Sequence, residues 1–264
     1  MPKSKRARYS GARQVNREEL DQVEAPAATA TWFPVQHSVV FDAVSSALGE
    51  AGFVVKRVQF WLYRKNGRMF AAVDLTNELA PGATLSIAVR NSIDRSLPLG
   101  CSAGNRAVVS DNLAFLCDIL VAKKHTLNGR ARFEGEITRA VRTLSAFHKH
   151  ERERVLALQQ RMIADETAEA IMLRAFEKRH VSARTLPLVI SQWREPSHEE
   201  FKPRSAWSLL NAFTTAISSR AKSNPQEYSR TTMRLGGLID AALGLRAFAL
   251  PAHVPEIDAP DSPA

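Results

Sequence analysis

The chain has 264 residues, of which 45% are hydrophobic and 24% are charged, and its formal net charge is +9. These fractions are typical of a globular protein that buries a sizeable core. No apolar run reaches the roughly 18–20 residues that a membrane span needs, so we expect no membrane partner. The positive charge favours a polyanion as the partner, because phosphate neutralisation releases counterions.

The cysteine content and the N-terminal stretch indicate a cytoplasmic protein. Cys101 and Cys117 form no CxxC pair, so we expect no disulfide framework and a reduced setting. The basic stretch from Lys3 to Arg17 is not followed by an apolar segment, which argues against a secretory signal.

We predict three regions along the chain. Residues 1–31 are expected to form a disordered basic tail, because they end in the small-residue stretch 25–30, which cannot build a core. Residues 251–264 contain four prolines and three acids and are expected to form a disordered acidic tail. Residues 32–250 should form a single α+β domain, sheet-rich over 53–115 and helical over 133–250.

The first half of this domain has the pattern of one helix and a mostly antiparallel sheet over residues 53–110. Apolar residues at helical spacing predict a helix over 37–50. Residues 53–63 alternate as in a strand, and Asn66-Gly67 predicts the hairpin turn to a return strand over 69–75. A third strand is predicted over 84–90 and a fourth over 106–109.

The second half has helical periodicity. One apolar stripe runs from Phe133 to Met162, which predicts one long helix. Asp165 or Thr167 is a candidate cap for a helix that ends near Phe176. Ser205 is the predicted cap of the next helix, and the last helix is predicted over 228–243 with its end at Gly244.

Several short motifs carry a resemblance to a known family. They are Arg90-Asn91-Ser92-Ile93-Asp94-Arg95-Ser96, Gly104-Asn105-Arg106, the stretch from Val109 through Asn112 to Phe115, Lys123-Lys124-His125-Thr126, and the stretch from Ser205 through Asn211 to Thr214. Together with residues 67–70 they resemble the domain of unknown function 932 family over roughly residues 37–220. The resemblance implies a shared fold and a phage or plasmid context, and it implies no particular activity. Ile93 and Ser110 depart from the family pattern, in which histidine and cysteine are frequent at these positions.

Two basic segments are candidate phosphate-binding sites. Arg90 to Ser96 could present several donors to a phosphate, although these residue types are more typical of a structural turn held by Asn91 and Asp94. The second segment contains Lys123, Lys124 and His125 together with Arg130 and Arg132, and basic residues outnumber acidic ones by seven to three over residues 90–132 as a whole. The residues that we predict to contact phosphates are Arg90, Arg95, Arg106, Lys123, Lys124 and Arg130.

Trp61 and Tyr63 alternate away from Phe60 and Leu62 on one strand and lie among basic residues. They could stack on unpaired bases. The alternative, which we favour, is that Trp61 belongs to the core, because a buried tryptophan contributes a large apolar area.

The sequence contains no recognisable catalytic, metal or cofactor signature. Cys101, Cys117 and His125 are spaced too irregularly for a zinc site, and the chain lacks a P-loop, a GxSxG and an HExxH motif. Asp94 and Asp111 could meet in space as part of a metal-dependent nuclease site. We therefore predict no cofactor and name no catalytic residue.

The leading hypothesis is a DNA-binding accessory protein of a phage- or plasmid-type element, with single-stranded DNA favoured and no catalytic chemistry. The first alternative is a protein-binding factor that modifies host processes or defence, so its partner would be a host protein. The second is a metal-dependent nuclease. Assembly into a homo-oligomer is compatible with each of these.

Overall fold

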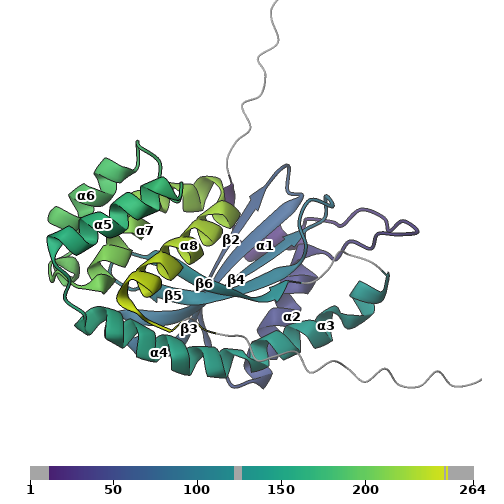
Figure 1. Cartoon of the computed structure of the whole chain (residues 1–264). Helices are drawn as coiled ribbons and strands as arrows, with labels where there is room; N and C mark the ends of the chain where they lie inside the picture. Colours follow the sequence, from purple (N-terminus) through teal and green to yellow (C-terminus); the bar gives the residue numbers. More distant parts are fainter. Residues whose placement is uncertain (1–11, 122–126, 247, 249–264) are drawn as a thin grey trace, which may run out of the picture.

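The computed structural model describes residues 12–121, 127–246 and 248, and it leaves the side chains of residues 120–133 and 220–223 undescribed. Figure 1 shows an antiparallel sheet enclosed by helices. The elements in chain order are β1 (Arg13–Val15), α1 (Arg17–Asp21), α2 (His37–Glu50), β2 (Val55–Tyr63), β3 (Arg68–Ala80), β4 (Ala83–Ser92), β5 (Gly100–Ala107), β6 (Asn112–Val121), α3 (Leu127–Arg142), α4 (Leu144–Gln160), α5 (Asp165–Glu177), α6 (Leu186–Arg194), the 3-10 turn η1 (Glu199–Phe201), α7 (Ala206–Ser223) and α8 (Pro225–Leu243).

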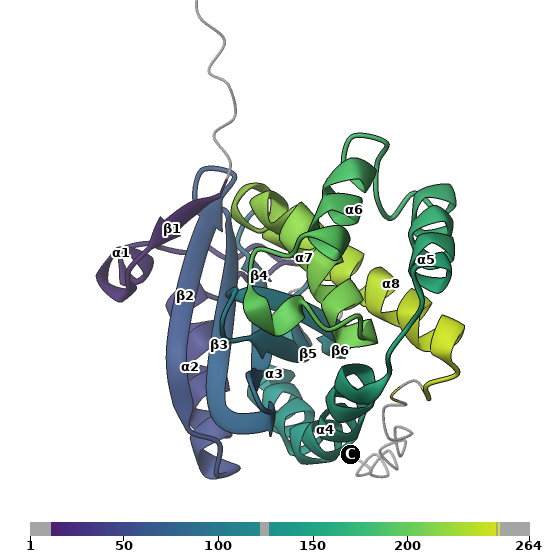
Figure 2. The ribbon, with the colours of Figure 1, turned by 90° about the vertical axis from the view of Figure 1, so that its left-hand side faces the viewer.

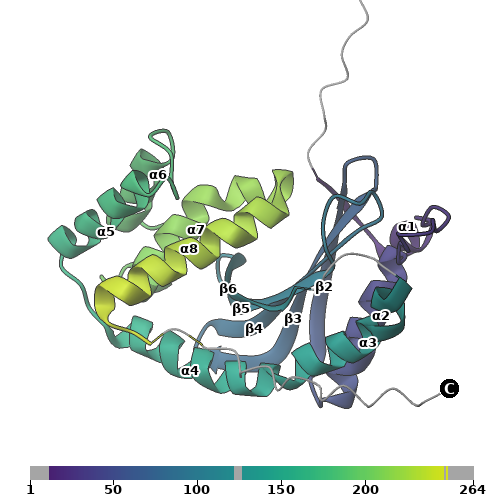
Figure 3. The same ribbon diagram turned by 45° about the vertical axis from the view of Figure 1, so that its right-hand side comes forward.

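The six strands form a meander in which each strand pairs with its neighbour in the chain. This arrangement confirms the predicted α+β class. Helices α2, α3 and α4 lie under one face of the sheet, and α7 and α8 lie over the other (Figure 3). Helices α5 and α6 pack beside α7 and α8 and away from the strands (Figure 2). None of the described helices is long and apolar enough to cross a bilayer.

Side-chain alternation along β2 assigns the two faces. Phe60 points toward α2, where its ring meets that of Phe41 at 4.8 Å between centroids. Trp61 points to the opposite face and packs on Phe70 of β3. One connected hydrophobic core includes residues from both the sheet and the helical half. Both faces of the sheet are therefore covered, as the mostly buried pattern of β4 and β5 also indicates.

Both outer edges of the sheet are protected against pairing with other chains. On β6, the Tyr228 hydroxyl donates to the Leu113 carbonyl at 2.6 Å, and the Phe115 N–H donates to the Thr232 hydroxyl at 3.1 Å. On β2, the short strand β1 pairs with Phe60–Leu62, and a bulge at Val55/Arg57 interrupts the remaining edge. Short edge strands, bulges and helix coverage are the usual defences of a sheet edge.

Most local predictions of helices and strands are confirmed. The helix over 37–50, the β2–β3 hairpin and the strand over 84–90 are present. The Ser205 hydroxyl accepts from the Ser208 N–H at 3.2 Å and so caps α7, and Gly244 ends α8 with a positive φ of 69°. In the β2–β3 turn, however, positive φ values fall on Arg64, Lys65 and Asn66, whereas we expected the glycine to adopt one.

The predicted end of the sheet was wrong. The fourth strand, expected over 106–109, is β5 at Gly100–Ala107, and a sixth strand follows at Asn112–Val121. Strand β5 has the sequence GCSAGNRA, whose small and polar residues carry little strand propensity. Strand β6 lies between helices on both faces, so its sequence lacks the alternation that marks a half-buried strand.

Two helical predictions also need correction, and one helix was missed. The stripe over 133–162 belongs to two helices, α3 and α4, which are separated at Thr143. The N-cap of α5 is Ala164, without a side-chain hydrogen bond, and Asp165 is its first helical residue. Helix α6 was not predicted.

The predicted disorder of residues 1–31 is wrong for the part that the structure describes. Strand β1 and helix α1 lie there, with Leu20 fully buried in the core. Asn16 and Glu19 form a capping box at the start of α1, a signal that the sequence contained. Arg17 donates two hydrogen bonds to Asp42 on α2, at 2.6 and 2.9 Å. Residues 1–11 and 251–264 lie outside the described residues, so their predicted disorder stays a prediction.

Candidate nucleic-acid interface

The loop that follows β4 is held by its own polar side chains. The Asn91 amide is fully buried, donates to the Val35 carbonyl at 2.8 Å and lies 3.0 Å from Nδ1 of His37. The Ser92 hydroxyl donates to the Leu97 carbonyl and accepts from the Leu97 N–H. Asp94 accepts from the N–H of Ser96 at 3.0 Å. These contacts match the structural turn that we favoured for residues 90–96.

Arg90 does not extend from this loop toward solvent. Its guanidinium donates to Asp118 of β6 at 2.8 Å and to Ser102 of β5 at 3.2 Å, and its side chain is 12% exposed. It lies flat over Gly100, where a Cβ would come within 2.5 Å of the guanidinium. Because its main contacts are internal, Arg90 is poorly placed to bind a phosphate.

Arg106 is buried in an ion cluster between the strands. Its side chain is 5% exposed and donates to Asp74 at 2.7 Å. Arg57 donates to the other oxygen of Asp74 at 2.8 Å and also binds Asp111, which holds the pKa of the Asp111 carboxyl below its ordinary value. Arg106 is therefore poorly placed to contact a phosphate.

The two aromatic residues of β2 differ in accessibility. Trp61 is only 8% exposed, so it belongs to the core, as we favoured, and cannot stack on a base. Tyr63 is partly buried at the end of the strand, with the Arg68 guanidinium 5.9 Å from its ring centroid. Burial raises the pKa of Tyr63 to about 12, while the cations Arg68, Arg90 and Arg230 act in the opposite direction.

Asn112 and Asn211 join the sheet to α7. The Asn112 amide donates to the Thr215 hydroxyl at 2.8 Å and to the Asn211 side-chain oxygen at 3.4 Å. The Asn211 amide in turn donates to the Trp207 carbonyl within α7. Both residues are buried, so their role in this structure is to position a helix on the sheet.

Part of the predicted basic cluster lies outside the described residues. Lys123, Lys124, His125 and Thr126 lie outside the described residues, and Arg130 lies on α3 with an undescribed side chain. Strand β6 ends at Val121, opposite Gly100, at the end of the sheet where the β2–β3 turn and the β4–β5 loop also lie. In the sequence, Lys123 and Lys124 come two and three positions after Val121.

Three exposed cations lie at this end of the sheet, and we call them the basic rim: Arg64 and Lys65 in the β2–β3 turn and Arg95 in the β4–β5 loop. The two loops touch, because the Ile93 N–H donates to the Gly67 carbonyl at 2.8 Å and a Cβ on Gly67 would lie 2.9 Å from that of Asp94. The sequence suggested Arg95 as a phosphate contact, whereas Arg64 and Lys65 appeared only as neighbours of Trp61.

An aromatic residue lies under the rim. The guanidinium of Arg95 is 4.6 Å from the centroid of the Trp32 ring, which is partly exposed. The only acid in either loop, Asp94, is bound by Arg68 at 3.3 Å. Nothing in the sequence pairs Trp32 with Arg95, which are 63 positions apart, so only the folded structure reveals this contact.

Several alternative sites are less favourable. Asp94 and Asp111 lie at opposite ends of the sheet and are each bound by arginine, so they do not form the carboxylate pair that a nuclease would need. Among the described residues, no group of three His, Cys, Asp or Glu could hold a metal ion.

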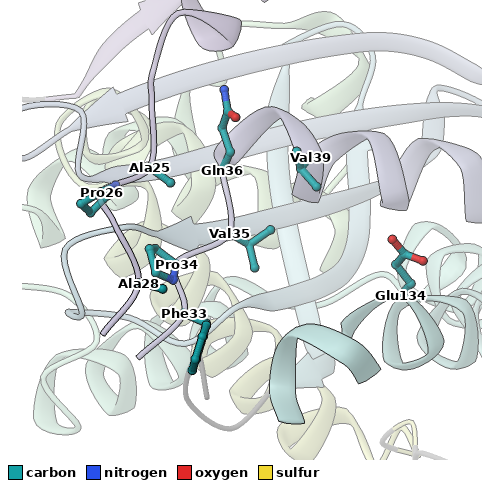
Figure 4. A pocket seen from close by; sticks show the side chains of 9 residues that line it. All are labelled: Ala25, Pro26, Ala28, Phe33, Pro34, Val35, Gln36, Val39 and Glu134. Carbon is teal, nitrogen blue, oxygen red and sulfur yellow. The ribbon is translucent and has the colours of Figure 1, made fainter. Parts of the chain in front are cut away.

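A hollow of about 410 Å³ lies between the segment before α2 and helix α3 (Figure 4). Seven of its nine described lining residues have apolar side chains, and the one charged residue among the nine is the acid Glu134. It therefore offers little to a phosphate. The lining residues are Ala25, Pro26, Ala28, Phe33, Pro34, Val35, Gln36, Val39 and Glu134.

Comparison of the chain with protein-family models, with curated proteins and with solved structures finds no match.

Proposed function

We propose that this chain is a DNA-binding accessory protein that binds single-stranded DNA on the basic rim. The observation that carries the proposal is the presence of Arg64, Lys65 and Arg95 on two touching loops whose only acid is already bound by Arg68. Such a cluster attracts a polyanion by neutralising phosphates and releasing counterions. The motif resemblance adds the expectation of a phage or plasmid context.

The preference for a single strand rests on the aromatic residues beside these cations. Unpaired bases stack on exposed aromatic rings and on guanidinium planes. The Arg95–Trp32 stack and the partly buried Tyr63 supply both kinds of surface next to the cations. The loops touch at Gly67 and Ile93, but the centres of the β2–β3 and β4–β5 hairpins are two strand spacings apart, about 10 Å, so their cations can contact different phosphates of one DNA strand.

Strain in the β2–β3 turn supports a functional role for this turn. Arg64 and Lys65 have φ values of 54° and 53°, in the left-handed region that costs non-glycine residues roughly 1–2 kcal/mol each. Backbone strain of this kind concentrates at binding sites. The turn therefore holds two cations in a conformation that glycine would adopt more easily.

Charge reversal of the rim tests the proposal. We expect the double variant Lys65→Glu/Arg95→Glu to reduce the salt slope of single-strand binding by about 1.4, since each lost phosphate contact removes about 0.7. The measurement is fluorescence anisotropy with a labelled oligonucleotide and its duplex at several salt concentrations. Lys149→Glu/Arg152→Glu on the exposed face of α4 is the matched control, with the same change in net charge and an unchanged slope.

Two results would count against this assignment. Equal slopes for the rim variant and the α4 variant would show that only overall charge matters. A wild-type protein that binds no DNA near physiological salt would remove the nucleic-acid function and direct the search to host proteins.

A second test separates strain from charge. We expect Lys65→Gly to raise the free energy of unfolding by about 0.5–1 kcal/mol, because glycine adopts the positive φ without steric cost. The same change should weaken DNA binding, because it removes a cation. Urea denaturation and anisotropy on the same preparation measure both effects, with Lys149→Gly as a control that should destabilise α4. A loss of stability in Lys65→Gly would contradict the strain argument.

A further inference from the structure

The N-terminal segment joins the body of the protein beside the basic rim. Strand β1 pairs with β2 in antiparallel register, with Arg13 opposite Leu62, and Figure 2 shows β1 alongside the end of β2 that leads into the β2–β3 turn. Continued by one position, this register brings Ala12 opposite Tyr63, the last residue of β2. Neighbouring strands are about 4.8 Å apart, so residues 1–11 connect to the body about one strand spacing from this turn.

The point of attachment is held firmly. The side chains of Val15 on β1 and Leu20 on α1 are buried in the hydrophobic core, and Ala12 packs against that core. The Arg17 guanidinium at the start of α1 binds Asp42 of α2 at 2.6 Å. The N-terminal segment therefore extends from a fixed point at the rim end of the sheet.

The N-terminal segment is strongly basic. Residues 1–11 contain no aspartate or glutamate and four basic residues, which are Lys3, Lys5, Arg6 and Arg8. Three acids on α1 and α2 already have cationic partners. Arg13 binds Glu19 and lowers the pKa of that carboxyl. Arg17 binds both Asp21 and Asp42. These three acids therefore compete little with an external polyanion for the four cations.

The four cations are close enough in sequence to reach a strand on the rim. They precede Ala12 by four to nine positions, which corresponds to about 14–30 Å of fully extended chain. Because β1 is the edge strand beside β2, the β2–β3 turn lies between the attachment point and the β4–β5 loop. The two hairpins of the rim are about 10 Å apart, so the segment is long enough to cover Arg64, Lys65 and Arg95.

We propose that residues 1–11 form a basic arm that closes over the DNA strand on the basic rim, and that the four cations of the arm contact phosphates of that strand. Basic N-terminal segments commonly bind nucleic acid through such contacts. The inference rests on the proposed function, because it adds a second element to the same binding site.

Neutralisation of the arm in the full chain tests the inference. We expect Lys3→Gln/Lys5→Gln/Arg6→Gln/Arg8→Gln to lower the salt slope of single-strand binding by about 2.8, since four phosphate contacts of about 0.7 each are lost. Fluorescence anisotropy with a labelled oligonucleotide at several salt concentrations measures the slope. The matched control should change the slope by less than about 0.7. It neutralises four exposed cations of the helical half, Lys149, Arg152, Lys178 and Arg184.

A further variant tests where the arm binds. If the arm closes over the strand that the rim holds, loss of the rim also weakens the contacts of the arm. Neutralising the arm in the Lys65→Glu/Arg95→Glu background should then lower the slope by less than about 1.4, half of the effect in the wild-type background. Equal effects in the two backgrounds would place the contacts of the arm away from the rim and overturn the inference.

The remaining outcomes separate the arm from the proposed function. If the rim variant behaves as proposed and the arm variant keeps the wild-type slope, the DNA-binding function stands and the arm inference is wrong. The arm inference is also wrong if the arm variant lowers the slope no more than the helical control does, because only net charge would then matter. A wild-type protein that binds no single-stranded DNA near physiological salt would remove both the function and the arm.

Discussion

Replacing Arg154 with leucine should lower the free energy of unfolding by about 3–5 kcal/mol, because it leaves two buried carboxylates without their cation. Arg154 and Glu151 are fully buried on α4, and Asp240 on α8 is nearly so. Glu151 also accepts from the Asn105 amide of β5 at 2.7 Å. The cluster therefore ties the sheet, α4 and α8 together, and urea denaturation followed by circular dichroism measures its loss.

Two further variants make this prediction specific. Arg152→Leu removes an exposed arginine from the same helix and should change stability by less than about 0.5 kcal/mol. The triple variant Arg154→Leu/Glu151→Leu/Asp240→Leu should recover most of the lost stability, because replacing a whole buried ion cluster by apolar residues is often neutral or stabilising. An Arg154→Leu protein as stable as the Arg152→Leu protein would show that the cluster contributes little.

The elements predicted correctly are those whose signals are local. Helix α2 has a regular apolar stripe, the β2–β3 hairpin has alternating strands around Asn66-Gly67, and Gly244 ends α8 in the expected left-handed conformation. The predictions for β5 and β6 were wrong because the pairing of these strands depends on partners elsewhere in the sheet. Residues 100–107 form a strand between β4 and β6. The sequence of this segment alone does not contain these pairing partners, so it does not predict the strand.

The predictions for the candidate site succeed or fail for the same reason. Positive charge is visible in a sequence, but its burial is decided by partners far along the chain. Asp74 lies 32 positions from Arg106, and Asp118 lies 28 positions from Arg90, and these pairs turn two predicted phosphate contacts into internal contacts. Arg95 remains exposed. Among the described residues, it forms no ion pair with an acid from another strand or helix. The local turn contact predicted for Asp94 is present, because Asp94 accepts from the N–H of Ser96 two positions on. Asn91 instead donates to the Val35 carbonyl, 56 positions away, a contact that the sequence did not indicate.

The Gly104-Asn105-Arg106 motif now has a structural explanation. Successive strand residues point to opposite faces, and here Asn105 binds Glu151 on the α4 side while Arg106 binds Asp74 on the other. Gly104 has a different role, because it allows β6 to approach. A Cβ at this position would lie 2.1 Å from the Ala114 carbonyl oxygen and 2.6 Å from the Phe115 Cα.

Gly104→Ala should therefore destabilise the protein by about 3 kcal/mol. The clashing atoms belong to the backbone of β6, so they can move away only if the β5–β6 pairing opens near its existing register shift at Ala103/Gly104. Gly49→Ala in α2 is the matched control: nothing lies within 4 Å of its new Cβ, and alanine should stabilise the helix by about 0.5–1 kcal/mol. Urea unfolding measures whether each substitution lowers or raises the free energy of unfolding. A Gly104→Ala protein within about 0.5 kcal/mol of wild type would mean that the Ala114 carbonyl lies farther from residue 104 than the 2.1 Å contact requires.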